Sequence, residues 1–298
     1  MATRSTWAMG GTMVELRPWL WPWWPALRPR APVVPVVRLS GVIGGPSLRG
    51  MGLSLNAINP ALERAFKVRG ARAVALSINS PGGSPVQSAL IAARIRSLAS
   101  DKNLPVVAFI EDVGASGGYW LALAADEIFA AASSIVGSIG VVHASFGLVD
   151  AIERLGIERR LHTAGSKKAM LDPFRPEDPE DVDRLMEVMT DVHTDFKGMV
   201  RQRRGDRLRA SDEELFEGQI WTGRKAAELG VIDGLGDLHG VLRERFGDKV
   251  KLPQIGAARP WWRRRLNVRR REVEAGTMAD AVLDAIAARL LWGRYGLH

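Results

Sequence analysis

The amino-acid sequence predicts an α/β protein built on a mainly parallel sheet with helices on its faces. Two observations support this class. Short runs rich in Val and Ile alternate with helix-length segments, and the connections carry the Gly, Pro, Asn and Ser residues that end strands or cap helices. Strands that alternate with helices pair in parallel, because each helix carries the chain back across the sheet. We expect strands at residues 33–39, 73–78, 106–110, 127–131 and 136–142.

Capping residues place the helices of the first half. Asn59 precedes Pro60, and this pair predicts a helix that begins there and runs to Phe66, since Asn is a good N-cap and Pro fits the first helical turn. Ser84 followed by Pro85 predicts a second helix in the same way. A third, apolar helix is expected to begin in the glycine-rich loop 114–118 and to end near residue 125.

The second half continues with helices and closes with a basic end. The pattern predicts a helix at 148–155, a strand at 158–162, a long amphipathic helix at 180–204 and a small unit at 219–233. A terminal amphipathic helix is expected at 278–292. We therefore expect three parts: a leader at 1–32, a single α/β domain at 33–250 and a tail at 251–298.

Composition excludes several classes of protein. The chain has 298 residues, of which 46% are hydrophobic and 25% charged, so it is neither disordered nor fibrous. It has no Cys, which excludes disulfides, a thiol nucleophile and Cys-ligated metal sites. The His, Asp and Glu residues show no metal-ligand spacing. Any nucleophile is therefore an oxygen or an amine, and we expect no metal or cofactor.

The two ends of the chain differ from its middle. Residues 251–298 hold ten basic and four acidic residues, although the whole chain has a net charge of only +8. Eight of the ten Trp residues lie before Pro25 or after Pro260. The N-terminal Trp cluster is broken by Pro and is too short to span a bilayer. Trp beside Arg favours the membrane interface, so we expect peripheral membrane contact and no nucleic-acid binding.

Two glycine-rich loops are the strongest candidates for chemistry. Ser80-Pro-Gly-Gly83 and Gly114-Ala-Ser116-Gly-Gly118 both follow predicted strands, so they meet at the carboxyl edge of a parallel sheet. Glycine lets backbone N–H groups face a ligand, as an oxyanion hole requires, and a Ser that starts a helix there is placed as a nucleophile. The alternative is that Ser116 only caps a helix.

The residues alone do not decide which side chain would act as the base that activates Ser116. The context of Ser116 is G-x-S-x-G, which also matches an α/β-hydrolase nucleophile whose partners would be Asp233 and His239. None of the five His residues lies in a recognisable base motif. A lysine can serve instead if its pKa falls by about three units. Lys167 and Lys168, among small and apolar residues in the loop 163–174, are the candidates.

Five blocks, in this order and spacing, resemble the signal peptide peptidase A family (serine peptidase family S49), and most closely its short, SohB-like bacterial members. The likeness covers residues 33–246, and its blocks are Ile78-Asn-Ser-Pro-Gly-Gly-Ser84, Asp112-Val-Gly-Ala-Ser-Gly-Gly-Tyr-Trp120, Ala124-Ala-Asp-Glu-Ile-Phe129, Val136-Gly-Ser-Ile-Gly-Val141 and Gly165-Ser-Lys-Lys168.

The resemblance implies a ClpP/crotonase-like fold, with repeated β-β-α units and a flanking helical region, and a Ser–Lys dyad. Ser116 matches the nucleophile and Lys168 the general base. Ser138 matches a serine that orients the lysine ammonium, while Gly83 and Gly117 match the oxyanion-hole donors. Lys167 stands at a variable position and is assigned no role.

The resemblance also implies a substrate class and an assembly. The family cleaves remnant signal peptides and other apolar, membrane-derived peptides, so a serine endopeptidase is expected. A short chain carries one dyad and needs neighbours to complete a substrate chamber, which implies a homo-oligomer. We expect association with the inner membrane of a bacterium, with the side undecided and a cytoplasmic location as the alternative.

Three other hypotheses are kept. A ClpP-like Ser–His–Asp peptidase would pair Ser116 with His143. A crotonase-type acyl-CoA enzyme would use the paired glycine loops to polarise a thioester carbonyl, with a carboxylate at the centre of the site. A membrane-bound scaffold with a degenerate site is the third, and the presence of Ser116, Ser138 and Lys168 argues against it.

Overall fold

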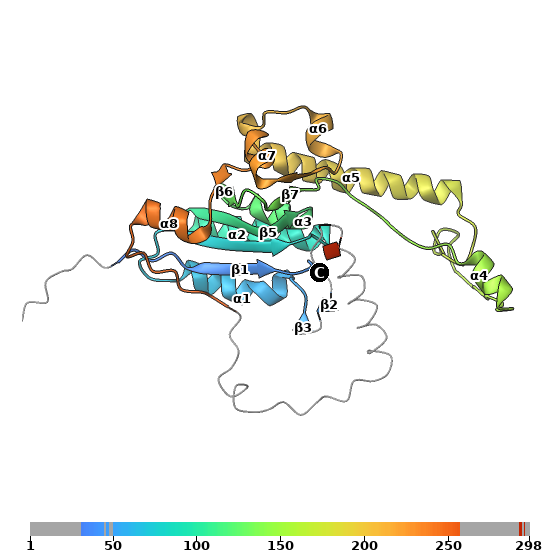
Figure 1. The fold of residues 1–298 in the computed structure, drawn as a ribbon. Helices are drawn as coiled ribbons and strands as arrows, with labels where there is room; N and C mark the ends of the chain where they lie inside the picture. The colour runs from blue at the N-terminus through green and yellow to red at the C-terminus, as the bar shows by residue number, and fades with distance from the viewer. Residues whose placement is uncertain (1–30, 45, 48–49, 257–291, 294, 296–298) are drawn as a thin grey trace, which may run out of the picture. The chain divides into compact units, whose positions relative to one another are not determined.

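The computed structural model describes residues 31–44, 46–47, 50–256, 292–293 and 295, and Figure 1 traces them in chain order. The first half alternates strands and helices. Its elements are β1 (Val36–Ser40), β2 (Pro46–Ser47), β3 (Gly50–Met51), α1 (Leu55–Phe66), β4 (Val74–Ser80), α2 (Pro85–Lys102), β5 (Val106–Ala115), α3 (Gly117–Ala122), β6 (Glu127–Ala130) and β7 (Ile135–Gly137).

The second half is mainly helical. Its elements are α4 (Val149–Arg154), α5 (Pro179–Arg204), the 3₁₀ turn η1 (Gly205–Arg207), α6 (Asp212–Phe216), β8 (Ile220–Thr222), α7 (Gly223–Glu228), β9 (Gly234–Leu235) and α8 (Leu238–Phe246). The tail segment predicted as a helix at 278–292 and the leader at 1–30 lie outside the described residues, apart from Trp292.

A seven-stranded sheet forms the centre of the domain. Its strands lie in the order β1-β4-β5-β6-β9, all parallel, and β7 joins β5 in parallel and β8 in antiparallel. The long strand β5 has two neighbours on one side, because residues 107–110 pair with β6 and residues 113–115 pair with β7. The α/β class and the mainly parallel sheet are therefore confirmed.

A β-β-α order repeats along the first half. After β1, Ile43 makes a second, short parallel bridge with Gly83, which itself follows β4. Helix α2 comes directly after Gly83, and α1 comes after Ile43 and the short hairpin of β2 and β3. In the third repeat both strand pieces lie within β5, before α3. This is the repeated unit expected of the ClpP/crotonase-like fold. It places the ends of β4 and β5 and the loops after them at one edge of the sheet.

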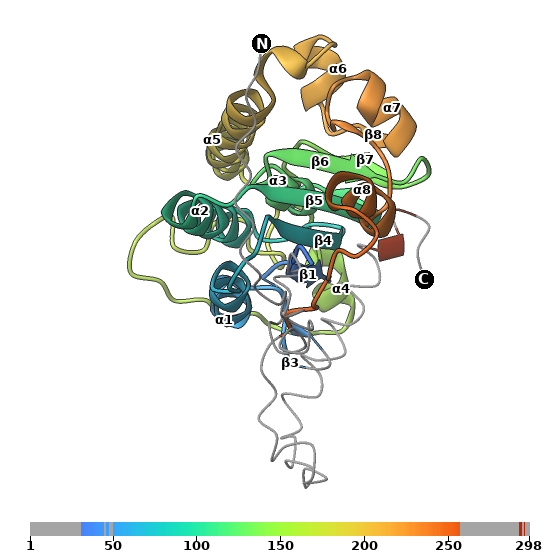
Figure 2. The same ribbon diagram turned by 90° about the vertical axis from the view of Figure 1, so that its left-hand side faces the viewer.

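The two faces of the sheet are buried by different helices. Alternate strand residues such as Leu76 and Ala108 join the core under α1, α2 and α3, while Ala75 and Val107 face Leu242 of α8. Figure 2 shows α1 and α2 on one side of the strands and α8 on the other. A strand that is buried on both faces consists almost entirely of apolar residues. The sequence predicts the strands of this sheet for that reason.

Three expected elements differ in the structure. The first helix begins at Leu55, because Ser54 caps it and the Leu55 N–H donates to the Gln87 side chain 2.9 Å away; Pro60 lies inside the helix. The strand expected at 136–142 ends at Gly137, where Ser138 takes a positive φ of 53°. Residues 158–162 form no strand and are exposed, since no sheet edge lies beside them to pair with.

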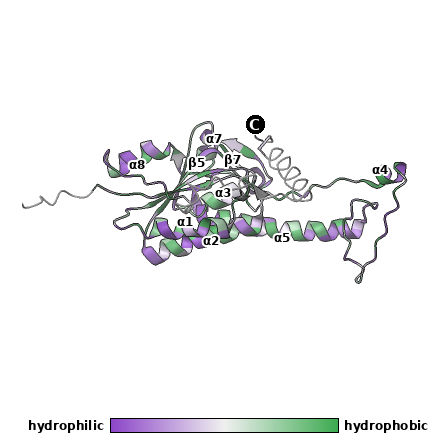
Figure 3. Ribbon diagram, turned by 90° about the horizontal axis from the view of Figure 1, so that it is seen from below, coloured by the Kyte–Doolittle hydropathy of each residue, from purple (hydrophilic) through white to green (hydrophobic). Residues whose placement is uncertain are grey.

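An exposed arm (residues 141–178) separates β7 from α5 and contains α4. Helix α4 has no buried residue, and Figure 1 shows the chain running out to α4 and back to the start of α5. Large apolar side chains on the arm are exposed, among them Phe146 at 80%, Leu155 at 72% and Val142 at 67%. Helix α5 carries hydrophobic and hydrophilic residues in turn (Figure 3), and no described helix is apolar enough over sufficient length to cross a bilayer.

Candidate functional site

Ser116 lies at the sharp turn between β5 and α3. Its backbone has φ 51° and ψ −123°, a conformation that non-glycine residues adopt rarely and at a cost of about 1–3 kcal/mol. The turn is held by a hydrogen bond of 2.7 Å from the Ser116 N–H to the Gly137 carbonyl. The hydroxyl caps no helical N–H and makes no hydrogen bond within the described residues. Ser116 thus occupies the N-cap position of α3, but its side chain does not cap the helix.

The two glycine-rich loops lie against each other. A Cβ on Gly82 would stand 2.8 Å from the Ser116 Cβ, and one on Gly83 would stand 2.1 Å from the Ile43 carbonyl oxygen. Both residues also have positive φ angles, 106° and 138°, so only glycine fits there. The N–H groups of Gly83 and Gly117 have no hydrogen-bond partner in the described part of the chain. They are available to a substrate oxygen, as an oxyanion hole requires.

A pocket of about 600 Å³ opens beside these loops and contains Ser116, Ser138 and Gly83. Ser138 adjoins Ser116 because β7 pairs with β5 in the register that places Gly137 opposite Ala115. The Ser138 N–H donates to the Gln219 carbonyl at 2.6 Å, which fixes the turn that carries its hydroxyl. The described residues that line the pocket are Pro81, Gly83, Pro85, Ser116, Ser138, Gly140, Val141, Val142, His193, Phe216, Glu217, Gly218 and Tyr295.

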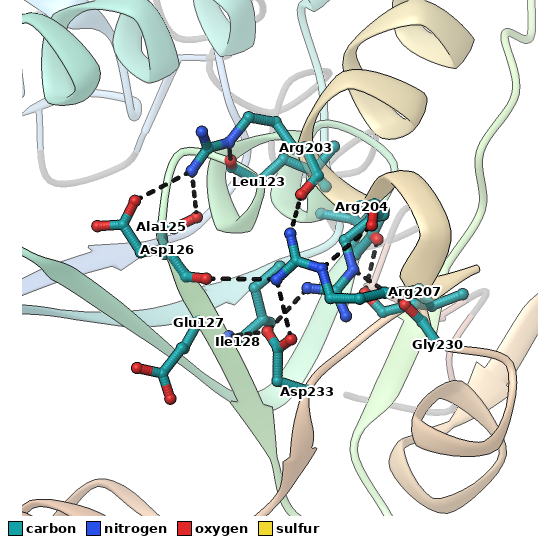
Figure 4. A network of polar contacts seen from close by, with 12 residues as sticks. Leu123, Ala125, Asp126, Glu127, Ile128, Arg203, Arg204, Arg207, Gly230 and Asp233 are labelled. Carbon is teal, nitrogen blue, oxygen red and sulfur yellow. Dashed lines mark hydrogen bonds and ion pairs between the residues drawn. The ribbon is translucent and has the colours of Figure 1, made fainter.

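Helix α5 is fixed to the end of α3 by an arginine network (Figure 4). Arg203 donates to the carbonyls of Leu123 and Ala125 at 2.8 and 2.7 Å. Arg204 is 3% exposed, donates to the Gly230 carbonyl at 2.9 Å and pairs with Asp233 at 2.7 Å. Because Ser116 directly precedes α3, this network holds α5 in a set position relative to the candidate nucleophile.

The structure does not bring Lys168 to Ser116 within one chain. Lys168 is exposed on the arm and is absent from the described residues that line the pocket. Its neighbour Lys167 is engaged elsewhere, since its Nζ lies 2.7 Å from Glu180 and 3.4 Å from Asp181. The hydrogen bonds to Glu180 and Asp181, together with their charges, hold the pKa of Lys167 above its usual value. Lys167 is therefore a charged residue that ties the arm to α5.

The histidine and carboxylate partners of the rival peptidase schemes lie away from the pocket. His143 is exposed on the arm, and His239 is exposed on α8. Asp233 pairs with Arg204 and Arg207 and accepts the Ile128 N–H at 2.7 Å. Burial by itself would raise the pKa of Asp233, but the hydrogen bond and charge of Arg204, with the charge of Arg207, hold it below the usual value. Asp233 thus has a structural partner already.

Three pocket residues had no role in the sequence analysis. His193 comes from α5, Glu217 follows α6, and Tyr295 comes from the tail. Tyr295 is 9% exposed and packs on Val113 and Ala115, just before Ser116. No local motif marks any of the three, because each reaches the pocket through packing between distant segments. The helical period of α5 was visible, but not which residue would lie opposite Ser116.

A comparison with protein-family models identifies the family. Residues 99–249 match the family model described as peptidase family S49. The chain belongs to this family. The blocks around Ser116, Ser138 and Lys168 all lie within the matched residues, whereas Gly83 precedes them. The resemblance to the signal peptide peptidase A and SohB type is therefore confirmed at the level of the family.

Individual relatives add detail. Over 274 residues the chain is 49% identical to a Brucella abortus protein named Na(+)/H(+) antiporter NhaA, covering 89% of this chain and 37% of that protein. It is 31% identical to the chloroplastic serine protease SPPA of Arabidopsis thaliana, over 69% of this chain and 31% of that one. It is 28% identical to the putative protease SohB of Buchnera aphidicola, over 68% of this chain and 56% of that protein. The chain thus spans about a third of the length of the first curated relatives it matches.

Proposed function

We propose that this chain is a serine endopeptidase that cleaves apolar, membrane-derived peptides, remnant signal peptides among them, with Ser116 as nucleophile and Lys168 as general base. The observation that supports it best is the strained turn at Ser116, a residue that lines one pocket with Gly83 and is followed directly by Gly117. Strain of this kind is kept where a reactive side chain must be presented. Membership of a peptidase family supports the same reaction.

The proposed reaction follows the usual two steps of acyl transfer. The neutral Lys168 amine takes the Ser116 hydroxyl proton as the oxygen attacks the peptide carbonyl, and the Gly83 and Gly117 N–H groups hold the resulting oxyanion. The lysine ammonium then protonates the leaving amine, which breaks the C–N bond and leaves an acyl-enzyme. Water, deprotonated by Lys168, hydrolyses the ester and restores Ser116. Ser138 orients the lysine by accepting a hydrogen bond from it.

Lys168 would reach Ser116 from a second copy of the chain. Within one chain the lysine is exposed on the arm, and the pocket with Ser116 lacks a lysine among its described residues. Several large apolar side chains of the arm are exposed too, which is typical of a surface that another subunit covers. A ring of copies in which each arm extends over its neighbour's pocket would complete every site. This arrangement fits the expected homo-oligomer.

Mixing two inactive variants tests this assignment. Ser116→Ala and Lys168→Ala should each abolish hydrolysis of an apolar fluorogenic peptide. If Lys168 acts between subunits, mixing the two variants in equal amounts after dissociation should restore about a quarter of wild-type activity, because a quarter of random pairings join an intact Ser116 to an intact Lys168. Activity in Lys168→Ala alone would refute the dyad. His143→Ala serves as the control and should remain active.

Membrane association is proposed for the Trp-rich ends. Arg beside Trp suits the headgroup region, and the tail is strongly basic. The full-length chain should therefore float with vesicles that contain anionic lipid. A variant in which six Trp residues are replaced by Ser should stay in the unbound fraction. The six residues are Trp19, Trp21, Trp23, Trp24, Trp261 and Trp262. Equal flotation of the two forms would refute anchoring by these residues.

A further inference from the structure

Glu217 places a carboxylate in the wall of the pocket that contains Ser116, and the proposed reaction does not use it. Among the described residues that line the pocket, Glu217 is the one Asp, Glu, Lys or Arg. The residue is exposed, and it forms no ion pair with another residue in the described part of the chain. Its carboxylate is therefore accessible to a group of a substrate bound in the pocket.

The pairing of β7 with β8 places Glu217 beside the candidate catalytic residues. The Ser116 N–H donates to the Gly137 carbonyl at 2.7 Å, and the next N–H, that of Ser138, donates to the Gln219 carbonyl at 2.6 Å. Glu217 precedes Gln219 by two positions, on the segment that leads into β8. This segment therefore runs alongside Ser138 and forms part of the same pocket wall.

The backbone of Glu217 is held from both sides. Phe216 is only 2% exposed, and the Arg201 guanidinium lies over its ring, 5.0 Å from the centroid. On the other side, the Gln219 side chain donates to the Glu213 carbonyl at 3.2 Å. The Glu217 side chain is thus presented to the pocket from a fixed backbone.

The chain around Glu217 is acidic. Residues 211–217 contain four acidic residues and no basic residue. Two of the four are engaged by basic side chains, in the pairs Asp212–Arg201 and Glu214–Lys225. Glu217 has no such partner within the described residues. The electrostatic potential on this side of the pocket is therefore negative, and it attracts a cationic group.

Much of the remaining pocket wall is apolar, with Pro81, Pro85, Val141 and Val142 among its residues. An apolar wall with a single carboxylate is complementary to an apolar peptide that carries a cationic residue. A secretory signal peptide has this composition, because a positively charged segment directly precedes an apolar segment of about 7–15 residues.

We propose that Glu217 is a specificity-determining residue, which forms an ion pair with a Lys or Arg side chain of a substrate whose apolar residues lie over Ser116. This inference rests on the proposed peptidase function and deepens it. An extended peptide advances about 3.3 Å per residue, so we expect the basic residue within about four positions of the cleaved bond. A remnant signal peptide would then be cut near the junction of its basic and apolar segments.

A contact between Glu217 and Lys168 of a second copy is the alternative. A carboxylate beside Lys168 would favour the charged form of the lysine and so oppose its role as a base. Loss of that contact would change the hydrolysis of every peptide by the same factor. Loss of an ion pair with the substrate changes only the hydrolysis of peptides that carry a basic residue.

The experiment measures kcat/KM for apolar fluorogenic peptides that differ at one position, which holds either Lys or norleucine. The position is moved through the four residues on each side of the cleaved bond. With the wild-type chain, Lys should be preferred about fivefold at the best position, which is the scale of an exposed ion pair. Glu217→Gln should reduce the ratio to about one, and Glu217→Lys should favour Glu over norleucine instead. The preference should fall in about 1 M salt, where charges are screened within about 3 Å.

Glu213→Gln is the matched control. It removes the same charge four residues earlier, and Glu213 is not among the described residues that line the pocket. It should keep most of the preference for Lys. Binding to Ser116→Ala, measured by fluorescence anisotropy, gives a readout without turnover. The Lys peptide should bind about fivefold more tightly than the norleucine peptide, and this difference should vanish in Ser116→Ala/Glu217→Gln.

The outcomes separate this inference from the proposed function. An unchanged ratio of Lys to norleucine hydrolysis in Glu217→Gln would overturn the specificity role and leave the peptidase function intact. An equal change for both peptides would also overturn it, because Glu217 would then act on the catalytic groups. If the wild-type chain hydrolyses neither peptide and a fluorophosphonate does not label Ser116, both proposals are wrong.

Discussion

Arg204 and Asp233 form a partly buried ion pair that joins α5 to the segment before β9. The Arg204 Nη1 lies 2.7 Å from the Asp233 carboxylate, and the arginine side chain is only 2% exposed. Asp233 also accepts the Ile128 N–H at the start of β6. The pair thus connects the sheet to the helix that carries His193, and every buried charge in it has a partner, as burial demands.

Replacing Arg204 by Met should lower the free energy of unfolding by about 2–3 kcal/mol, because it leaves the buried Gly230 carbonyl without its donor and removes one partner of the partly buried Asp233 carboxylate. Urea unfolding followed by circular dichroism measures this. Arg160→Met is a suitable control, since Arg160 pairs with Glu158 on the surface with 75% of its side chain exposed. It should change stability by less than about 0.5 kcal/mol. Similar losses in both variants would contradict the importance of the buried pair.

Asp233 also predicts how stability depends on acid. Its pKa is held below the usual 3.8 in the folded chain, so its contribution to stability is present above that value and is lost as pH falls through the lower, folded pKa. The difference in unfolding free energy between wild type and Asp233→Asn should therefore be largest near neutral pH. It should shrink progressively below about pH 4. A difference that grows on acidification would contradict the lowered pKa.

Gly83→Ala should damage both the fold and the site. The new Cβ would lie 2.1 Å from the Ile43 carbonyl oxygen at a φ of 138°, so the loop must move. We expect a loss of about 1–3 kcal/mol in stability and loss of peptidase activity. Gly198→Ala, on α5 with open space around it, is the control and should stabilise the chain by about 0.5–1 kcal/mol. Full activity in Gly83→Ala would show that this N–H does not bind the oxyanion.

Lys167 should affect activity through the position of the arm. Lys167 directly precedes Lys168, and its contacts with Glu180 and Asp181 hold this part of the arm against α5. Asp181 also accepts the Leu171 N–H. Lys167→Ala should lower kcat by about fivefold or less, and Lys167→Arg should recover most of it. Because the pKa of Lys167 is raised, the contact is present throughout neutral pH and is lost only as pH rises above 10.5. Abolished activity in Lys167→Ala, with Lys168→Ala active, would reverse the two roles.

Local patterns in the sequence were enough to predict much of the site. The glycine loops, Ser116 and its neighbour Ser138 lie next to strand ends, so their positions follow from the α/β class and the parallel sheet. The predicted start of α1 at Asn59 and Pro60 was wrong. Ser54 and Gln87 hold the first turn of this helix, and Gln87 is distant in sequence. The expected strand at 158–162 failed because strand pairing depends on a neighbour that a local pattern cannot supply.

The order of strands and helices, the loops that require glycine and the family of the chain can all be predicted from the sequence, because each is encoded by residues close together in the chain. Which charges pair and which side chains share the pocket is known only from the three-dimensional fold. Lys167 is engaged by α5, Arg204 is paired with Asp233, and His193 lines the same pocket as Ser116. These relations depend on packing between segments far apart in sequence, where no local periodicity or spacing carries the information.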